Sequence, residues 1–304
     1  GQRLDRQRAV TSLYGIVSGE SPSGNQYGDW QLKPAKKGNV MQFVAANGIN
    51  LAYTIDGEAD KPWIVLCHSL ATDHRMWAPQ MDAFTQSHRV LRYDTRGHGG
   101  SDVPAGDYTI STLVDDLVGL LAALKIENVD IMGISLGGAT AVGLALEYPD
   151  LVRRVICCDA IVESTPQYAD GWRERIAIAT EKGLGALWEG TSGRWLTDEF
   201  RAAPSNAETV KLVQDMFLGT SVHGFSGCAA ALTTLNYQSR LPSLVAPCLC
   251  VTGSDDVAAP PEVMGQIATA VENGDLEVIE NAAHLSNLNQ PEAFNAAVLE
   301  WLRR

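Results

Sequence analysis

The segment Gly133-Ile134-Ser135-Leu136-Gly137 constrains the fold of this chain most strongly. An apolar, strand-like run (129–132) precedes it, and a helix-like run (139–146) follows it. A serine in Gly-x-Ser-x-Gly between a strand and a helix lies at a strained corner, with its hydroxyl clear of the sheet. The flanking glycines suit such a corner because closely packed backbone leaves no room for side chains. Ordinary turns contain the same residues, but this context predicts that Ser135 is a nucleophile.

Two later segments supply the partners that such a serine requires. A serine hydroxyl reacts well only when a base takes its proton, and the base needs an acid to hold its tautomer. Residues 277–283 form a short strand and a small-residue loop that lead to His284. Residues 248–254 form a strand that leads to Asp255 and Asp256. The sequence therefore predicts a serine, an acid and a histidine, in that order, at the ends of three strands.

The choice of base is clearer than the choice of acid. Of the six histidines, only His284 follows a late strand after the acid. Structural or surface roles are expected for the other five, which are His68, His74, His88, His98 and His223. Asp255 and Asp256 are adjacent, and Asp159 follows another apolar run, so the residues alone leave three candidate acids open.

Three segments resemble the α/β-hydrolase superfamily: 67–77 (CHSLATDHRMW), 91–102 (LRYDTRGHGGSD) and 283–287 (AHLSN). More narrowly, they resemble the 3-oxoadipate enol-lactonase and esterase group, over roughly Met41 to the C-terminus. The chain order of serine, acid and histidine is also that of the superfamily triad. In the family the acid is the fourth residue of a Gly-x-x-Asp loop. The resemblance therefore selects Asp256, beside Ser135 and His284, as the catalytic acid.

The resemblance also implies an oxyanion hole. Backbone N–H groups that point at the substrate carbonyl oxygen stabilise the charge that develops there. One expected donor is the N–H of Leu136, which follows the nucleophile at the start of its helix. The other is Leu70 in the loop after the third strand, with Ser69 as the alternative. The superfamily usually has His-Gly in that loop, where this chain has His68-Ser69.

Substrate contacts are expected from the same resemblance, because enol-lactonase-like enzymes act on small acids. The planar fork of an arginine can donate two parallel hydrogen bonds to a carboxylate. Arg75 follows the oxyanion loop, and Arg173 and Arg175 lie close to Trp172. We predict Arg75, Trp172 and Arg173 as substrate-binding residues; a solvated or structural role is the alternative for each arginine. The block 94–101 is expected to be a structural turn held by internal hydrogen bonds.

The alternation of strand-like and helix-like segments predicts an α/β fold, and the resemblance specifies the α/β-hydrolase fold. Alternation of this kind gives a mostly parallel eight-stranded sheet with helices on both faces. The expected strands are near 41–46, 49–56, 62–67, 89–93, 129–134, 154–159, 247–252 and 275–280. The expected helices are 109–125, 135–148, 261–273 and 291–303.

The alternation stops between about 162 and 240, where the sequence is helix-like and rich in aromatic residues. The superfamily carries a helical cap at this point, after the sixth strand. We therefore predict a core made of 39–161 and 241–304, with a helical cap at 162–240. Residues 1–38 form a polar N-terminal arm that could include a short helix at 10–17.

Composition limits the partners. The chain has 23 basic and 36 acidic residues, and its net charge of −13 disfavours nucleic acids and anionic membranes. No apolar run approaches the roughly 20 residues of a membrane span. Several of the six cysteines lie in strand-like runs, which favours reduced thiols and a cytoplasmic location. No spacing resembles a zinc site, so neither a metal nor a cofactor is expected. A small-molecule substrate is expected, and a homo-oligomer stays open.

The resemblance implies a serine hydrolase that cleaves an ester or lactone of a small organic acid through an acyl-enzyme. An anionic acid would suit the predicted arginines. Two alternatives remain at this stage. The same triad could cleave a carbon–carbon or amide bond, because only the pocket differs. The chain could also be a small-molecule receptor on a hydrolase scaffold, in which turnover is slow or absent.

Overall fold

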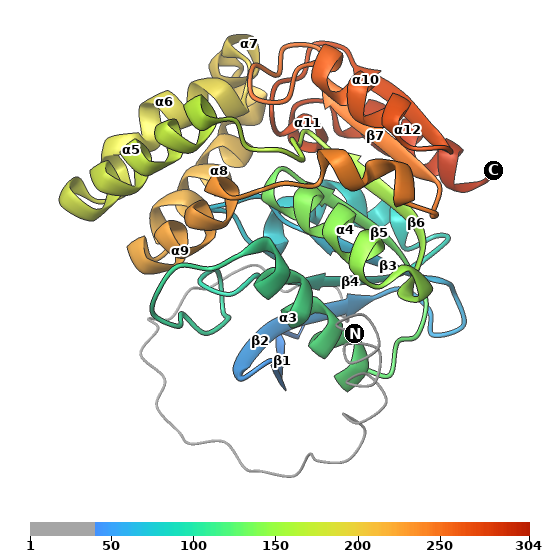
Figure 1. Ribbon diagram of the computed structural model, residues 1–304. Coiled ribbons are helices and arrows are strands. Elements are labelled where there is room, and N and C mark those ends of the chain that lie inside the picture. The colour runs from blue at the N-terminus through green and yellow to red at the C-terminus, as the bar shows by residue number, and fades with distance from the viewer. Residues whose placement is uncertain (1–39) are drawn as a thin grey trace.

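The computed structural model describes residues 40–304 and contains the expected eight-stranded sheet (Figure 1). Its strands are β1 Gln42–Ala46, β2 Ile49–Asp56, β3 Trp63–Cys67, β4 Arg89–Tyr93, β5 Val129–Ile134, β6 Val152–Cys158, β7 Cys248–Gly253 and β8 Gly274–Ile279. Their order is β1-β2-β4-β3-β5-β6-β7-β8, and only β2 runs against the others. The predicted fold class, the α/β-hydrolase fold, is confirmed.

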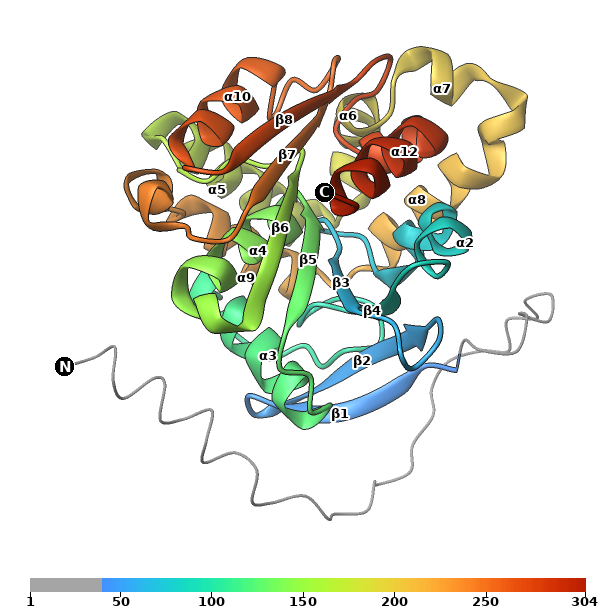
Figure 2. The same ribbon diagram turned by 90° about the vertical axis from the view of Figure 1, so that its right-hand side faces the viewer.

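Helices cover both faces of the sheet. The long ones are α3 Ile110–Ala123, α4 Leu136–Glu147, α10 Pro261–Ala270 and α12 Pro291–Leu302. Figure 2 shows α3, α4 and α10 on one face, and α12 with the short helix α2 (Met81–Phe84) on the other. All six residues of β5 are buried, as expected for a parallel strand covered on both sides. The predicted long helices are therefore correct to within a few residues.

Short helices near the strand ends were not predicted. They are η2 His74–Gln80, α2 and α11 Ser286–Asn289. Each spans at most seven residues, too few for an apolar periodicity to show in the sequence. They matter because η2 follows the predicted oxyanion loop and α11 follows His284.

A separate group of helices lies between β6 and β7 in the chain and falls within the predicted cap (Figure 1). These are α5 Pro166–Lys182, α6 Gly185–Trp195, α7 Asp198–Ala202, α8 Ala207–Gly219 and α9 Val222–Thr233. Thr165 caps α5 by accepting a hydrogen bond from the N–H of Tyr168. Helix α9 lies so close to the loop after β4 that a Cβ on Gly224 would be 1.9 Å from the Gly97 carbonyl oxygen. This backbone contact fixes the helices α5 to α9, which together form a helical layer, against the loop after β4.

The predicted arm (1–38) and its helix at 10–17 lie outside the described residues. Within residues 40–304, none of the helices combines the length and the apolar content that a bilayer crossing requires.

The corner between β5 and α4 depends on close backbone packing. A Cβ on Gly137 would lie 2.1 Å from the carbonyl oxygen of Cys67, at the end of β3. A Cβ on Gly133 would lie 2.1 Å from the carbonyl oxygen of Gly137 itself. Neither position can hold a side chain unless the backbone moves, so both glycines of the motif are required by the fold.

We expect Gly137→Ala to destabilise the protein by at least about 1–3 kcal/mol, the usual range for overpacking, because its methyl group meets backbone. Thermal or urea unfolding of the purified variants measures this. The matched control is Gly171→Ala in the middle of α5, where nothing lies within 4 Å of the added Cβ. Alanine is the better helix former there, so the control should be at least as stable as the wild type. Equal stability of Gly137→Ala and the wild type would contradict this account of the corner.

Candidate active site

Ser135 lies at the corner between β5 and α4 in a backbone conformation that is rare for serine. Its φ is 57° and its ψ is −116°, in the left-handed region that side chains disfavour. Its N–H donates to the Cys158 carbonyl at 2.9 Å, and its own carbonyl accepts from the N–H of Ala139 at 3.0 Å. These bonds hold the strained turn in place and leave the Ser135 side chain in the lining of a cavity.

His284 and Asp256 form a buried pair beside the same cavity. The Nδ1–H of His284 donates to Oδ2 of Asp256 at 2.9 Å, which leaves Nε2 without a proton and able to act as a base. The other carboxylate oxygen of Asp256 accepts from the N–H groups of Ala258 at 2.7 Å and Ala259 at 3.1 Å. Asp256 is thus oriented by its own loop and in turn orients the imidazole ring.

The charges of this pair shift both pKa values in opposite directions. Burial tends to lower the pKa of His284, but the negative charge and the hydrogen bond of Asp256 outweigh burial and raise it. Burial tends to raise the pKa of Asp256, but the charge and hydrogen bond of His284 and the two backbone amides lower it. The carboxylate therefore stays ionised, and it stabilises the positive imidazolium that forms when His284 accepts a proton.

The structure separates the three candidate acids. Asp256 alone bonds to His284. Asp255 is exposed, and its carboxylate accepts only a long hydrogen bond from the Ser254 hydroxyl, at 3.4 Å. Asp159 is buried; its carboxyl group accepts from the Gly253 N–H at 2.9 Å and is hydrogen-bonded to the Ser286 hydroxyl at 2.5 Å. Asp256 has the geometry of the acid that the family resemblance selects.

The cavity has a volume of about 270 Å³ and lies between the strand ends and the helical layer. Ser135 and His284 line it from the core. Aromatic residues of the helical layer line the other side, and they are Tyr168, Trp172, Trp195, Phe217 and Phe225. The predicted contact residue Trp172 is therefore in place, and the cavity is mostly apolar with a few polar groups, as small-molecule sites are.

The two expected oxyanion donors have free N–H groups. Within residues 40–304, neither Leu70 nor Leu136 donates its backbone N–H to another group. Leu136 is the first residue of α4, where backbone donors have no partner in the helix. The alternative, Ser69, directs its N–H to Sδ of Met76 at 3.3 Å, which makes it the poorer candidate. Leu70 lines the cavity beside Ser135.

The structure does not bring two of the predicted substrate contacts to the cavity. Arg75 forms a double hydrogen-bonded ion pair with Asp73, at 2.6 Å for its closest contact, and lines a different depression. Arg173 is exposed on α5 and pairs with Asp170, three residues earlier. Local carboxylates hold both arginines, so closeness in sequence to the site was misleading.

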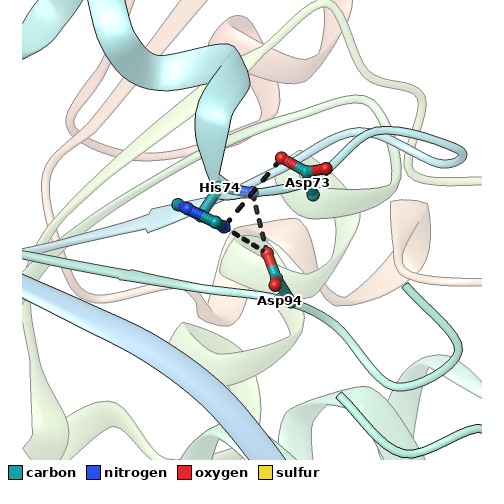
Figure 3. Close-up of side chains that lie close together, drawn as sticks. All are labelled: Asp73, His74 and Asp94. Atoms are coloured by element: carbon teal, nitrogen blue, oxygen red, sulfur yellow. Dashed lines mark hydrogen bonds and ion pairs between the residues drawn. The ribbon is translucent and has the colours of Figure 1, made fainter. Parts of the chain in front are cut away.

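The same region contains a cluster of Asp73, His74 and Asp94, shown in Figure 3. Asp94 accepts from the N–H and Nδ1 of His74 at 2.9 and 2.8 Å, and from the N–H of Gly100 at 2.8 Å. Arg75 donates to both carboxylate oxygens of Asp73. The carboxylate oxygens of Asp73 and Asp94 therefore already have partners within the protein. These bonds connect the loop after β3 to the 94–101 block, which has the internal hydrogen bonds expected of a structural turn.

Two arginines line the cavity: Arg175, which the sequence analysis named beside Arg75 and Arg173, and Arg194, which it did not name. Arg175 lies over the ring of Trp172, 4.7 Å from its centroid, and Arg194 makes only a long contact with Thr191 at 3.4 Å. Neither pairs with a carboxylate in the described chain. Burial and the nearby charge of Arg175 lower the pKa of Arg194. No local sequence signal separates them from Arg173, because their orientation depends on how the helices pack.

Comparisons with known proteins agree with this architecture. Residues 62–291 match the family described as alpha/beta hydrolase fold, and the chain belongs to that family. It is a hydrolase that resembles the enol-lactonases.

A 3-oxoadipate enol-lactonase of Acinetobacter baylyi is 33% identical over 262 residues, which cover 86% of this chain and 96% of that protein. The solved enol-lactonase from Burkholderia xenovorans has a TM-score of 0.81 and 35% identity, covering 86% of this chain and 100% of its own. A second Acinetobacter baylyi protein, (E)-2-((N-methylformamido)methylene)succinate hydrolase, is 28% identical over 259 residues, which cover 84% of this chain and 95% of that protein.

The His284–Asp256 pair predicts a defined pH dependence. With His284 as the base, the reaction needs its neutral form, so kcat/KM for a neutral ester should rise with pH, with a midpoint above the ordinary histidine pKa of about 6.5. Asp256→Asn removes the charge and presents an amide that favours the wrong tautomer. We expect kcat to fall by up to about 10⁴-fold and the midpoint to move to lower pH. Asp255→Asn, in the same loop but exposed, is the control and should resemble the wild type; the reverse ranking would move the acid to Asp255.

Proposed function

We propose that this hydrolase cleaves an ester or lactone of a small organic acid by two-step acyl transfer. The proposal rests mainly on the buried His284–Asp256 pair. His284 lines the same cavity as Ser135, which lies at its strained corner. The similarity to enol-lactonases supports the bond type. The small cavity volume, about 270 Å³, supports a substrate of modest size.

In the first step, Nε2 of His284 takes the proton of the Ser135 hydroxyl as the serine oxygen attacks the substrate carbonyl carbon. The tetrahedral intermediate collapses when the protonated histidine gives its proton to the departing oxygen, leaving an acyl-Ser135 enzyme. In the second step, His284 takes a proton from water, which attacks the acyl carbon. Breakdown of this second intermediate returns the proton to Ser135 and releases the acid.

Asp256 stays ionised through both steps and stabilises the imidazolium. The free N–H groups of Leu70 and Leu136 are the proposed donors to the oxyanion. Such donors are fixed by the backbone before the reaction begins, so no reorganisation is needed when the charge develops. Trp172 and the other aromatic residues of the helical layer would contact the apolar part of the substrate.

An anionic substrate is the form that the cavity favours. Arg175 and Arg194 bring two positive charges to a largely apolar space, and neither has a carboxylate partner in the described chain. A cation that is partly buried without a counter-ion is unfavourable, and a substrate carboxylate would relieve this. We therefore propose that one or both arginines bind a carboxylate of the substrate. The sequence had suggested this role for Arg175 as well as for Arg75 and Arg173.

Hydrolysis of an amide is a second candidate. The relative named (E)-2-((N-methylformamido)methylene)succinate hydrolase supports it, since its name includes a formamido group. The same triad could cleave such a bond if His284 protonates the departing nitrogen. A panel of matched lactones, esters and amides separates the two, because only the leaving group changes.

The cysteines indicate the compartment in which the protein works. All six cysteines are buried free thiols, which supports a reducing compartment such as the cytoplasm. A small-molecule substrate is the only partner that the site itself requires.

The role of Ser135 is tested by Ser135→Ala, which should lower kcat by roughly four to six orders of magnitude with an unchanged melting temperature. A fluorophosphonate probe should label the wild type at Ser135, as shown by peptide mass spectrometry, and should not label the variant. Steady-state turnover of an aryl ester also separates an enzyme from a receptor, which would give at most a single slow burst. Labelling at another serine, or substantial activity in the variant, would sink the assignment.

The proposed anion site predicts a selective effect of charge removal. Arg194→Ala or Arg175→Ala should lower kcat/KM for an anionic lactone by about tenfold or more, the usual effect of losing a charged hydrogen bond of 1.5–3 kcal/mol. Turnover of the neutral methyl ester should change much less. Arg173→Ala is the control, because that side chain lies on the same helix as Arg175 but pairs with Asp170 outside the cavity. Equal losses on both substrates would leave a neutral ester or lactone as the better substrate.

A further inference from the structure

Asp159 has an unusual position next to the proposed triad. It follows the last residue of β6, it is fully buried, and its φ of 46° is positive. Its N–H donates to the Val251 carbonyl at 2.8 Å, which ties it to β7. Asp159 also lines the cavity together with Ser135 and His284. The mechanism described above makes no use of this carboxyl group.

The Asp159 side chain joins the two loops that carry the acid and the base. Its Oδ1 accepts from the N–H of Gly253 at 2.9 Å, three residues before Asp256. Its Oδ2 bonds to the hydroxyl of Ser286 at 2.5 Å, two residues after His284. One buried side chain therefore spans the acid loop and the base loop, whose relative position sets the His284–Asp256 distance.

The surroundings of Asp159 disfavour a negative charge. Burial and the nearby charge of Asp256 raise the pKa of Asp159 to about 8, although His284, Ser286 and the Gly253 amide oppose the rise. Two ionised carboxyl groups near one histidine repel each other, and Asp256, which is bonded to the histidine and two amides, keeps the negative charge. The other ionisable groups of the cavity, Tyr168, Arg175 and Arg194, form no hydrogen bond with Asp159.

We infer that Asp159 is a positioning residue that joins the acid loop to the base loop as a neutral carboxyl group. The inference rests on the proposed triad, because it assigns ionised Asp256 as the acid. The location of the hydrogen follows from the contacts. The Gly253 N–H occupies Oδ1, so the proton of Asp159 lies on Oδ2 and is donated to the Ser286 oxygen.

Asn and Ala substitutions separate a neutral bridge from an ionised acid. Asp159→Asn preserves the proposed bridge, since its amide oxygen can accept from Gly253 and its NH₂ can donate to Ser286. We expect kcat at pH 7 within about threefold of the wild type. Asp159→Ala removes both bonds and should lower kcat by about tenfold or more, because small displacements of catalytic groups are expensive. Ser286→Ala removes one bond and should lie between these two variants.

A pH profile provides a readout that a purely structural role would not move. Above pH 8, ionisation of Asp159 in the wild type adds a negative charge beside the oxyanion and the base, so kcat/KM for a neutral ester should fall. Asp159→Asn cannot ionise and should keep its activity through this range. The neutral ester ensures that no charge on the substrate contributes to the profile, and Asp255→Asn serves as the charge control in the adjacent loop.

The outcomes are distinguishable. If Asp159→Asn loses activity as severely as Asp256→Asn while the fluorophosphonate still labels wild-type Ser135, Asp159 acts ionised and the inference is wrong. Wild-type kinetics and an unchanged alkaline limb in Asp159→Asn, Asp159→Ala and Ser286→Ala would also overturn it. Failure of Ser135 labelling would instead remove the proposed function. Should Asp159→Ala fail to fold, Asp159→Asn still tests the inference through its kcat at pH 7 and its kcat/KM above pH 8.

Discussion

At the corner between β5 and α4, the main chain of two strands and a helix comes into direct contact, and this contact organises the site. Gly137 lies against the end of β3, so the nucleophile corner and the oxyanion loop are held together by main chain rather than by side chains. This packing allows Ser135 its positive φ, because the hydrogen bonds around it resist relaxation. The same contact brings Leu70, in the loop after β3, and Leu136, at the start of α4, to the same side of the sheet as Ser135.

Three aspartates that are equivalent candidates in the sequence have different electrostatic environments in the structure. Asp255 faces solvent, Asp256 accepts from a histidine and two amides, and Asp159 is buried between loops. Hydrogen-bond donors stabilise the charged form of Asp256, and its charge in turn disfavours ionisation of Asp159. Environment rather than residue type therefore determines which carboxyl group pairs with the histidine and which one joins two loops.

The helical layer contributes the aromatic and the positively charged residues that line the cavity opposite Ser135 and His284. Its aromatic residues make the space apolar, and Arg175 and Arg194 add positive charge without nearby acids. Arg173 differs from Arg175 by two positions, yet it points to solvent and pairs with Asp170. Two residues correspond to about 200° around a helix, so the two side chains face opposite directions. Small changes in such a layer would change the substrate while the core chemistry stayed the same.

The fold class, the eight strands, the long helices and the candidates Ser135, His284 and Asp256 could all be predicted from the sequence. These follow from periodicity, from the Gly-x-Ser-x-Gly corner and from family motifs, all of which are local in the chain. Only the tertiary structure decided that Arg75 and Arg173 pair with neighbouring aspartates, that Arg175 and Arg194 line the cavity, and that Asp159 bridges two loops. The Asp159–Ser286 bond joins residues 127 positions apart, and the cavity lining comes from segments that are equally distant in the chain. The two arginine–aspartate pairs are local, but whether an arginine turns toward a nearby aspartate or into the cavity depends on how the helices pack.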